Sequence, residues 1–510
     1  MGARSVGLAA LAVAVAATGC GGTGERERGR STPRPNHAEW RLPNGDTSNT
    51  RRVGGPIDAS SVRRLKLAWR VEIGPIVANP VVARGVVYVQ DMDSNVSAIS
   101  LSSGRELWTH FFEQLSIGPN GVAVEGDRIY GATSTEAFAQ QTRTGRVLWR
   151  RRLVRNAHEG IDMAPGLWRG AVYLSTVPVN RRRTYGAGAR GTIWALDAGT
   201  GRPRWRWMTV PRDLWGRPDV NSGGGLWYPP AFDDDGQLYA SVANPGPWAG
   251  TPRYPWGSSR LGPNRWTNSL VKLNARTGRF TWGRQVLPHD MYDWDLECPP
   301  ILTQANGRPL VVVAGKMGFV YALDRASGRL VWKRSVGLHN GHDDDGRKTM
   351  AGGNGGLRSG ERILPGQLGG VETPMAVDDD TVYVPVENNA SIHTGVAQGE
   401  SESLLDKGGG EVVALDLASG RVKWDRRLPE SAWGGVVVVN DLVFTPTFEG
   451  TVWALRAADG SVAWKARLPA GVNAPLAVVG DTLIAAAGQP LEIAQSANVV
   501  AYRLTGDGGR

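Results

Sequence analysis

Short apolar runs that end in Ala-Leu-Asp, or in a close variant of it, recur along most of the chain. Each run is followed by a polar turn that ends in Thr-Gly or Ser-Gly, in most copies by an Arg, and then by a Trp. The run Ile193–Asp197, for example, is followed by Gly201 and Trp205. Short apolar runs that are rich in β-branched residues and bounded by glycine turns predict β-strands rather than helices.

Eight copies of this unit can be counted by their turn glycines, which are Gly104, Gly145, Gly201, Gly278, Gly328, Gly420, Gly460 and Gly506. The last copy ends before its Trp. The run that contains Trp69, in contrast, has a Trp and no preceding partner. An N-terminal strand around Trp69 would therefore complete the last copy and close a ring, which removes exposed sheet edges.

Two further strand signals precede each copy, so that each repeat contains four strands. One is a β-rich run such as Val172–Leu174, and the other is a short apolar run after a proline, as at Pro374. Repeats of this kind predict an all-β protein, an eight-bladed β-propeller with four-stranded antiparallel blades over residues 56–506. Eight of the 20 tryptophans would then be flat apolar plates that pack between neighbouring blades.

Long insertions fall only in the loops between the second and third strand of a blade and in the connections from one blade to the next. In an up-and-down blade these two kinds of loop lie on the same face. The insertions cover residues 175–192, 206–227, 244–269, 283–299, 338–373 and 387–411. Function concentrates in the elaborated loops of a scaffold, so we expect a site on the axis of this face.

The N-terminus resembles an export signal over residues 1–20. Arg4 is followed by the apolar stretch 6–17 and by a small-residue segment that ends in Cys20, as in a bacterial lipobox. We expect Cys20 to be lipidated and residues 21–55 to form a tether. The protein would then be exported and lipid-anchored to the outer side of the cytoplasmic membrane. The alternative is a cleaved periplasmic or extracellular protein.

Composition narrows the function further. The net charge is +10, but the basic residues are scattered along the chain and are not interleaved with aromatic residues, so we expect no nucleic-acid partner. Of the two cysteines, only Cys298 would remain as a free thiol once Cys20 is lipidated. A lone cysteine of this kind is usually a small buried apolar residue.

The repeat resembles that of the pyrroloquinoline quinone (PQQ) dehydrogenases, which are eight-bladed quinoprotein alcohol dehydrogenases. A denser stretch strengthens the resemblance, because four segments match the core site motifs of that family in order and spacing. They are Gly223–Trp227, Ala243–Trp248, Pro288–Asp295 and Gly315–Arg325.

This resemblance implies a role for each matching residue. Trp227 would stack under the quinone and Lys316 would contact a quinone oxygen. Asn244 and Asp293 would bind the metal, and Asp293 would be the catalytic base that takes the alcohol proton. Asp295 resembles the additional carboxylate of lanthanide-using relatives, so the implied cofactors are PQQ with Ca²⁺ or a lanthanide.

Other interpretations of these residues stay open. Trp227 could anchor a loop, Asn244 could be a turn residue, Asp293 could cap backbone amides, and Lys316 could be solvated.

The chain also departs from the family pattern, since Gly186 stands where the family has a metal-binding Glu and no vicinal cysteine pair is present. Two functions therefore remain. The first is a PQQ-dependent dehydrogenase-like enzyme with a small-molecule substrate and an unknown electron acceptor. The second is a non-catalytic propeller lipoprotein that acts as a binding or scaffold module.

Overall fold

The computed structural model describes residues 38–178, 186–354, 356–395, 397–405, 408–488 and 496–506. Within these residues the chain is all-β, with one short α-helix, α1 (Asp345–Thr349), and two 3₁₀ turns, Val62–Arg64 and Ser258–Arg260. None of the described helices is long and apolar enough to cross a membrane. Cys20 and the predicted export signal lie outside the described residues.

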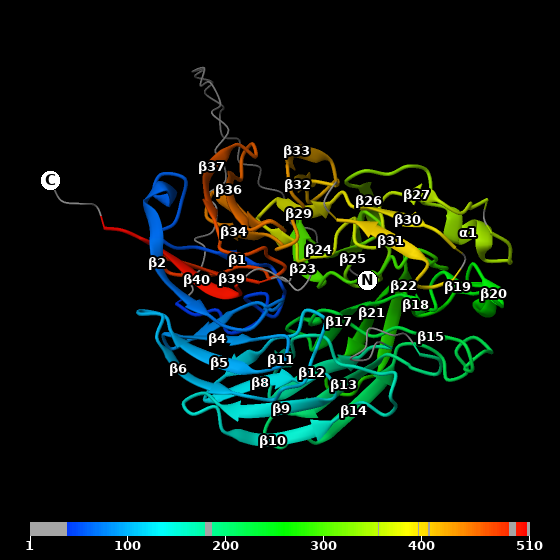
Figure 1. The fold of residues 1–510 in the computed structure, drawn as a ribbon, viewed down its shortest axis with the longest axis horizontal. Helices are drawn as coiled ribbons and strands as arrows, with labels where there is room; N and C mark the ends of the chain where they lie inside the picture. Colours follow the sequence, from blue (N-terminus) through cyan, green and yellow to red (C-terminus); the bar gives the residue numbers. More distant parts are fainter. Residues whose placement is uncertain are drawn as a thin grey trace, which may run out of the picture. The chain divides into compact units, whose positions relative to one another are not determined.

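Eight mainly antiparallel sheets, seven of four strands and one of five, follow one another along the described chain (Figure 1), and we number them in that order. Sheet 1 contains β3 (Val81–Ala83), β4 (Val86–Gln90), β5 (Val96–Ser100) and β6 (Glu106–His110). Sheet 2 contains β7 (Ala123–Glu125), β8 (Arg128–Ala132), β9 (Glu136–Gln141) and β10 (Val147–Arg152). Sheet 3 contains β11 (Gly166–Trp168), β12 (Ala171–Thr176), β13 (Thr192–Asp197) and β14 (Pro203–Met208). Sheet 4 contains β16 (Ala231–Phe232), β17 (Gln237–Val242), β21 (Ser269–Asn274) and β22 (Phe280–Gln285).

The second half of the chain repeats this plan. Sheet 5 contains β23 (Ile301–Ala305), β24 (Arg308–Gly315), β25 (Phe319–Asp324) and β26 (Leu330–Ser335). Sheet 6 contains β28 (Ala376–Val377), β29 (Thr381–Glu387), β32 (Gly410–Asp416) and β33 (Val422–Leu428). Sheet 7 contains β34 (Val437–Val439), β35 (Leu442–Pro446), β36 (Thr451–Arg456) and β37 (Val462–Arg467), with β1 (Arg52–Val53) added in parallel to β34. Sheet 8 contains β38 (Ala477–Val479), β39 (Thr482–Ala487), β40 (Asn498–Leu504) and β2 (Leu65–Glu72).

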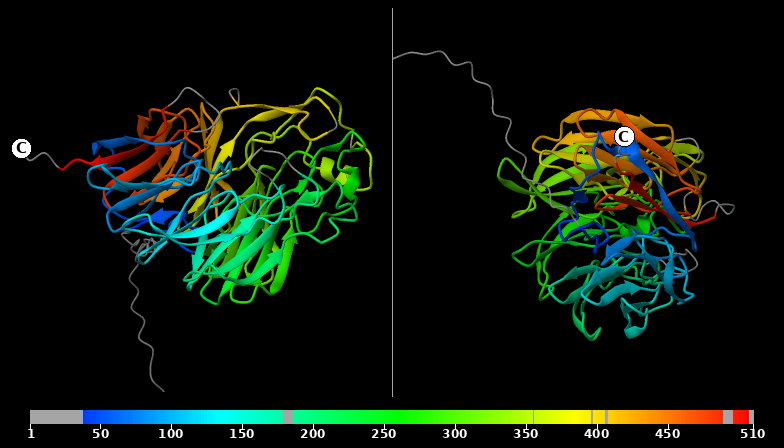
Figure 2. Two further views of the ribbon diagram at one scale, coloured as in Figure 1. Left: turned by 60° about the horizontal axis from the view of Figure 1, so that its bottom comes forward. Right: turned by 90° about the vertical axis from the view of Figure 1, so that its left-hand side faces the viewer.

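Strand β2 comes from the start of the described chain, yet it pairs with β40 near its end (Figures 1 and 2). The register runs from Leu65 opposite Leu504 to Glu72 opposite Asn498. The predicted N-terminal strand around Trp69 therefore supplies the outer strand of the last sheet, as the unpartnered Trp of the sequence indicated.

Neighbouring sheets pack through the repeated tryptophans. Gly420, in the turn of sheet 6, has a φ of +69°, and a Cβ atom added to it would lie 2.6 Å from Cε3 of Trp332 in sheet 5. Only glycine gives both the left-handed backbone and the close approach of the indole ring. The Trp332 indole N–H also donates to the carbonyl oxygen of Leu417. The predicted packing of Trp plates between sheets is confirmed at this contact.

The segment 40–53 passes from sheet to sheet and contradicts the predicted tether over residues 21–55. Its carbonyl oxygens accept hydrogen bonds from the innermost strands of sheets 1, 2, 4, 5, 6 and 7, at Val82, Val124, Phe232, Leu302, Val377 and Val438. Trp40 is only 1% exposed, and Arg51 is fully buried. The described part of the predicted tether is therefore packed structure, because buried apolar and backbone groups hold it against the sheets.

The long insertions carry most of the remaining elements. They form β15 (Ser222–Gly223) with β18 (Pro245–Gly246), β19 (Gly250–Thr251) with β20 (Tyr254–Pro255), and the three-stranded sheet of β27 (Glu361–Ile363), β30 (Ala390–His393) and β31 (Ser401–Leu404). All of them lie in second-to-third-strand loops or in connections between sheets, at the ends of the strands where the sequence predicts a functional face.

Candidate functional site

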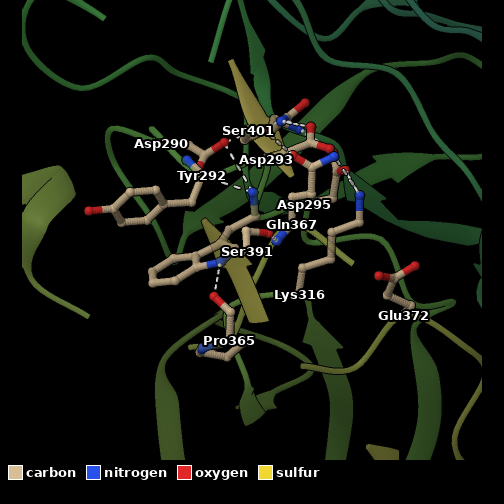
Figure 3. Close-up of polar contacts among 12 residues, drawn as sticks. Asp290, Tyr292, Asp293, Asp295, Lys316, Pro365, Gln367, Glu372, Ser391 and Ser401 are labelled. Atoms are coloured by element: carbon tan, nitrogen blue, oxygen red, sulfur yellow. Dashed lines mark hydrogen bonds and ion pairs between the residues drawn. The ribbon is translucent and has the colours of Figure 1, made fainter. Parts of the chain in front are cut away.

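Four of the predicted site residues lie at the same end of sheets 4 and 5. Asn244 follows β17, Lys316 follows β24, and Asp293 and Asp295 lie in the connection between β22 and β23. Figure 3 shows the side chains of Asp293, Asp295 and Lys316 turned toward one another. The tertiary structure thus brings together residues that three separate loops supply.

Hydrogen bonds and ion pairs join these four side chains. The Asn244 amide donates to Asp293 Oδ1 over 2.7 Å, and the Asn244 backbone N–H donates to Asp295 Oδ1 over 2.8 Å. Lys316 Nζ lies 2.9 Å from Asp295 Oδ2 and 3.4 Å from Asp293 Oδ2. A single ammonium group therefore bridges both carboxylates, and Lys316, which is only 6% exposed, is not a solvated lysine.

Asp293 is held in an unusual conformation. Its φ of +64° lies in the left-handed region, which a non-glycine residue seldom adopts, and backbone strain of this kind is common at functional sites. Burial raises the pKa of Asp293 to about 7, although the charge of Lys316 acts in the opposite direction. A carboxyl group with such a pKa can exchange a proton near neutral pH.

The capping role that remained open for Asp293 belongs to its neighbour Asp290. The Asp290 carboxylate accepts the backbone N–H groups of Tyr292 and Trp294, and also the Asn244 amide. Asp293 itself contacts the side chains of Asn244 and Lys316.

Charge on Lys316 is stabilised by its surroundings. Burial alone would lower its pKa, but the carboxyl groups of Asp293, Asp295, Glu297 and Glu372 raise the pKa well above its usual value. The ammonium form is therefore the state of Lys316 in the folded protein.

Trp227 lies apart from this hydrogen-bonded group. Its indole Nε1 is buried and has no hydrogen-bond partner within the part of the chain that the structure describes. Its ring reaches toward the start of sheet 2, where a Cβ added to Gly118 would lie 3.0 Å from Trp227 Cζ3. The structure thus shows a buried indole N–H without a partner among the described residues, and stacking of Trp227 under a quinone stays a prediction.

Two buried glutamates belong to this region and were not among the predicted site residues. Glu297 and Glu372 are 7% and 8% exposed, and one carboxylate oxygen of each lacks a hydrogen-bond partner among the described residues. Burial raises the pKa of Glu372 to about 7 and that of Glu297 well above its usual value.

Alignment of the repeats on the inner strands would have found both glutamates. Trp227, Glu297, Glu372 and Trp433 precede Phe232, Leu302, Val377 and Val438 by the same number of residues. These last four residues are the ones whose N–H groups bind the segment 40–53 in sheets 4 to 7. The two glutamates therefore occupy the position of Trp227 in the next two sheets.

The donor chemistry around Asp293 fits a hard cation. Two carboxylates and one amide are oxygen-bearing groups of the kind that Ca²⁺ and lanthanides prefer, and a cation would neutralise buried acid. The described residues contain no group of three or more His, Cys, Asp or Glu side chains placed to hold a metal ion. The predicted set of metal ligands therefore needs the Asn244 amide in addition to the two aspartates. The charged Lys316 ammonium likewise fits an oxygen-rich cofactor, to which it could donate hydrogen bonds.

The position of the expected metal-binding Glu is occupied differently. A Cβ added to Gly186 would lie 2.0 Å from Cγ of His158. Introducing a glutamate at Gly186 would therefore require the imidazole of His158 to move, and the substitution cannot simply restore a ligand.

Comparison with known proteins gives the class of the chain. Residues 143–335 match the family profile described as glucose/ethanol/alcohol dehydrogenase, beta-propeller domain. Residues 64–176 and 267–508 match the profile described as outer membrane protein assembly factor BamB. The protein is therefore propeller-like.

Individual relatives agree with this class. The quinohemoprotein alcohol dehydrogenase of Comamonas testosteroni is 29% identical over 384 residues, which cover 65% of this chain and 52% of the relative. The structure of the quinohemoprotein alcohol dehydrogenase ADHIIG from Pseudomonas putida aligns with a TM-score of 0.80 at 22% identity, covering 92% of this chain and 81% of the other. A europium-containing methanol dehydrogenase aligns with a TM-score of 0.76 at 20% identity, covering 91% of this chain and 98% of the other.

The chain belongs to the PQQ-dependent alcohol dehydrogenase-like family of β-propeller proteins. It spans about half the length of the curated relative described above.

Proposed function

We propose that this protein is a PQQ-dependent, dehydrogenase-like quinoprotein that oxidises an alcohol or a related small substrate on the axis of an eight-bladed propeller. The observation that carries this function is the placement of Asp293, a buried carboxyl group held between Asn244 and Lys316 with its pKa raised to about 7.

The eight sheets would be the blades of one ring. The inner strand β3 of sheet 1 contacts β7 of sheet 2 on one side and β38 of sheet 8 on the other. Trp69 of sheet 8 packs against Gly104 of sheet 1 in the same way as Trp332 packs against Gly420. The last sheet thereby meets the first, which supports closure of the ring through β2.

Each residue of the site would have a defined task. Asn244, Asp293 and Asp295 would hold a Ca²⁺ or lanthanide ion, while Trp227 and Lys316 would hold PQQ. When bound, the quinone supplies the acceptor of the hydride and the cation polarises its carbonyl group. Asp293 would orient the substrate hydroxyl and take its proton at a carboxylate oxygen, since the chain positions this base by two side chains before substrate arrives.

Reconstitution of the purified full-length protein with PQQ and Ca²⁺, or with PQQ and La³⁺, tests this function. We expect quinone absorbance that stays with the protein after gel filtration, and alcohol-dependent reduction of an artificial dye. Asp293→Asn removes the base and keeps the size of the side chain, so it should lower dye reduction by about 10²–10⁴-fold and retain bound PQQ.

Two further variants separate the roles. Lys316→Ala should weaken PQQ binding, because it deletes a charged donor to an anionic ligand. Asp219→Asn, at an exposed position where the carboxylate pairs with Arg217, should change neither PQQ binding nor dye reduction. Wild-type protein that shows neither quinone absorbance nor dye reduction would contradict the enzymatic function.

The second candidate is a binding or scaffold propeller without turnover. Gly186 in place of the family's metal-binding Glu favours it, together with the lack of a three-residue metal group among the described positions. In either case we propose that the protein is exported and anchored by a lipid on Cys20. An active enzyme would pass its electrons to an acceptor that is still to be identified.

A further inference from the structure

The two residues on either side of Asp293 are fixed in place. Tyr292 and Trp294 are 1% and 2% exposed, and their backbone N–H groups donate to Asp290 Oδ1 over 3.1 and 3.2 Å. The Asp290 carboxylate therefore closes a turn over residues 290–294, within which Asp293 has its φ of +64°. A left-handed backbone at a residue other than glycine persists only where the surrounding structure holds it.

The side chain of Tyr292 is anchored outside this turn. Its hydroxyl group donates to Asp345 Oδ2 over 2.7 Å, and Asp345 is the first residue of α1, in the insertion 338–373. The same carboxylate pairs with His342 Nδ1 over 2.7 Å and with Lys348 Nζ over 2.6 Å. Burial acts to raise the pKa of Asp345, but hydrogen bonds with these three side chains lower the pKa below its ordinary value. Asp345 is thus an ionised and oriented acceptor for the hydroxyl group.

Trp294 is anchored to the same insertion at a second point. Its indole N–H donates to the carbonyl oxygen of Pro365 over 3.1 Å, and its ring centroid lies 4.9 Å from that of Tyr292. The helix α1 also approaches this region closely, because a Cβ atom added to Gly346 would lie 1.9 Å from the carbonyl oxygen of His289. The insertion therefore contacts the connection between β22 and β23 at three separate points.

We propose that Asp345 is a positioning residue for Asp293, and that it acts through the hydroxyl group of Tyr292. The side chains of Tyr292 and Asp293 point in different directions from the chain (Figure 3), so that one is fixed in the insertion while the other belongs to the candidate site. Without the anchoring bond, the backbone at Asp293 relaxes out of the left-handed region, and its carboxylate moves away from Asn244 and Lys316. The positioning is a property of the chain itself, whereas its consequence for catalysis rests on the proposed dehydrogenase function.

The bonds to Asp290 do not by themselves fix the Asp293 carboxylate in the site. They join groups within one turn, so they would keep the local shape while the turn moved as a unit. Asp345 and Pro365, in contrast, lie 53 and 71 residues further along the chain than the side chains that they bind. Their bonds restrain the turn against a separate part of the molecule. A catalytic group needs such restraint because it must stay within about 0.5 Å of its working geometry.

The variant Tyr292→Phe tests the proposal, because it removes the hydroxyl group and keeps the buried ring. Hydrogen–deuterium exchange of the purified full-length protein, followed by mass spectrometry, measures the protection of the backbone N–H groups of residues 290–296. We expect their exchange to become about tenfold faster, which is the change that the loss of one ordinary hydrogen bond gives. Crystal structures of both proteins should show that Asp293 leaves the left-handed region, and loses its contact with Asn244, in the variant alone.

Tyr173→Phe is the matched control. Tyr173 is also buried, and its hydroxyl group donates to the carbonyl oxygen of Ala275 over 3.0 Å. Loss of this bond should leave the exchange of residues 290–296 unchanged. Asp345→Ala should reproduce the effect of Tyr292→Phe, whereas Asp345→Asn keeps an acceptor oxygen and should have a smaller effect.

The consequence for catalysis is measured separately, in protein reconstituted with PQQ and Ca²⁺. Tyr292→Phe should lower kcat for dye reduction, counted per bound PQQ, by about 10- to 100-fold, because a small displacement of the base is costly. KM for the alcohol should stay as in the wild type, since no group that touches the substrate is deleted. Tyr173→Phe should change neither kcat nor KM.

Three results would overturn the proposal. The first is equal exchange of residues 290–296 in the wild type and in Tyr292→Phe, with Asp293 unmoved in the crystal. The second is an effect of the same size in Tyr173→Phe, because the change would then reflect global stability. The third, in an active enzyme, is an unchanged kcat per bound PQQ in Tyr292→Phe. If exchange rises as expected while the wild type shows neither quinone absorbance nor dye reduction, the positioning stands and the enzymatic function fails.

Discussion

The indole N–H of Trp69 donates to the carbonyl oxygen of Leu101 over 2.8 Å, and so connects sheet 8 to sheet 1. Trp69 lies on β2, close to the start of the described chain, and its own sheet contains the last strands. The contact repeats that of Trp332 with Leu417 between sheets 5 and 6. The contact between sheets 8 and 1 therefore has the same form as the contact between two sheets that follow each other along the chain.

Removal of this connection should destabilise the protein. Deletion of residues 60–72 removes β2 and leaves β40 as an exposed edge, so we expect loss of cooperative melting. Trp69→Ala is the milder change and should lower the free energy of unfolding by about 3–5 kcal/mol, because the side chain is 8% exposed. Urea denaturation followed by tryptophan fluorescence measures it.

A control for this prediction lies on the same strand. Leu67 is 58% exposed, so Leu67→Ala should change the free energy of unfolding by less than about 0.5 kcal/mol. Unchanged melting of the deletion variant would contradict closure through β2.

The buried guanidinium of Arg51 should be equally important. It donates to the carbonyl oxygens of Val436 and Leu476. These two residues lie directly before the first strands of sheets 7 and 8, β34 and β38. Arg51→Ala leaves these buried carbonyl groups without partners, and we expect a loss of about 3 kcal/mol or more. Denaturation by urea tests it, with Arg63→Ala at an exposed position as the control. Equal stability of the two variants would contradict the role of the segment 40–53.

Stability should depend on pH through Glu372. Its pKa is about 7 in the folded protein and 4.5 in its ordinary state, so the folded protein holds the proton more tightly. The stabilisation is complete below pH 4.5 and is lost as the pH rises from 4.5 to 7, by about 3 kcal/mol in total. Unfolding free energies at pH 5 and pH 7.5 should differ less in Glu372→Gln than in the wild type. An identical difference in both proteins would show that Glu372 does not titrate in this range.

Lipid attachment can be tested at the predicted cysteine. Cys20→Ser should abolish incorporation of labelled fatty acid and move the protein from the membrane fraction to the soluble fraction, since a thioether-linked lipid is the expected anchor. Cys298→Ser serves as the matched control, because Cys298 is fully buried. Membrane association that is the same in the wild type and in Cys20→Ser would reject the lipoprotein prediction.

Local sequence determined the strands and their sheets. The turn glycines and the tryptophans recur because each sheet packs on the next through the same contact, as between Gly420 and Trp332. The unpaired Trp69 run likewise predicted β2 and its pairing with β40. Patterns of this kind are readable because they repeat and because, apart from the pairing of β2 with β40, the strand pairs of each four-stranded unit join segments that follow one another along the chain.

Tertiary structure decided how the site is charged. The sequence indicated Asn244, Asp293, Asp295 and Lys316 by family motif, but not that one ammonium group bridges both aspartates. It also gave no sign that residues 40–53 form packed structure instead of a tether. Segments without a repeat take their conformation from contacts with many sheets at once.

Glu297 and Glu372 were not among the predicted site residues, although both hold the position of Trp227 when the repeats are aligned. The tertiary structure adds that both carboxyl groups are buried and that Glu372 accepts the indole N–H of Trp433. The sequence by itself therefore determined the repeating sheets, which depend on neighbours along the chain. The charge balance of the candidate site was decided by the tertiary structure, because burial and the distances between residues of different sheets set the cost of each carboxylate.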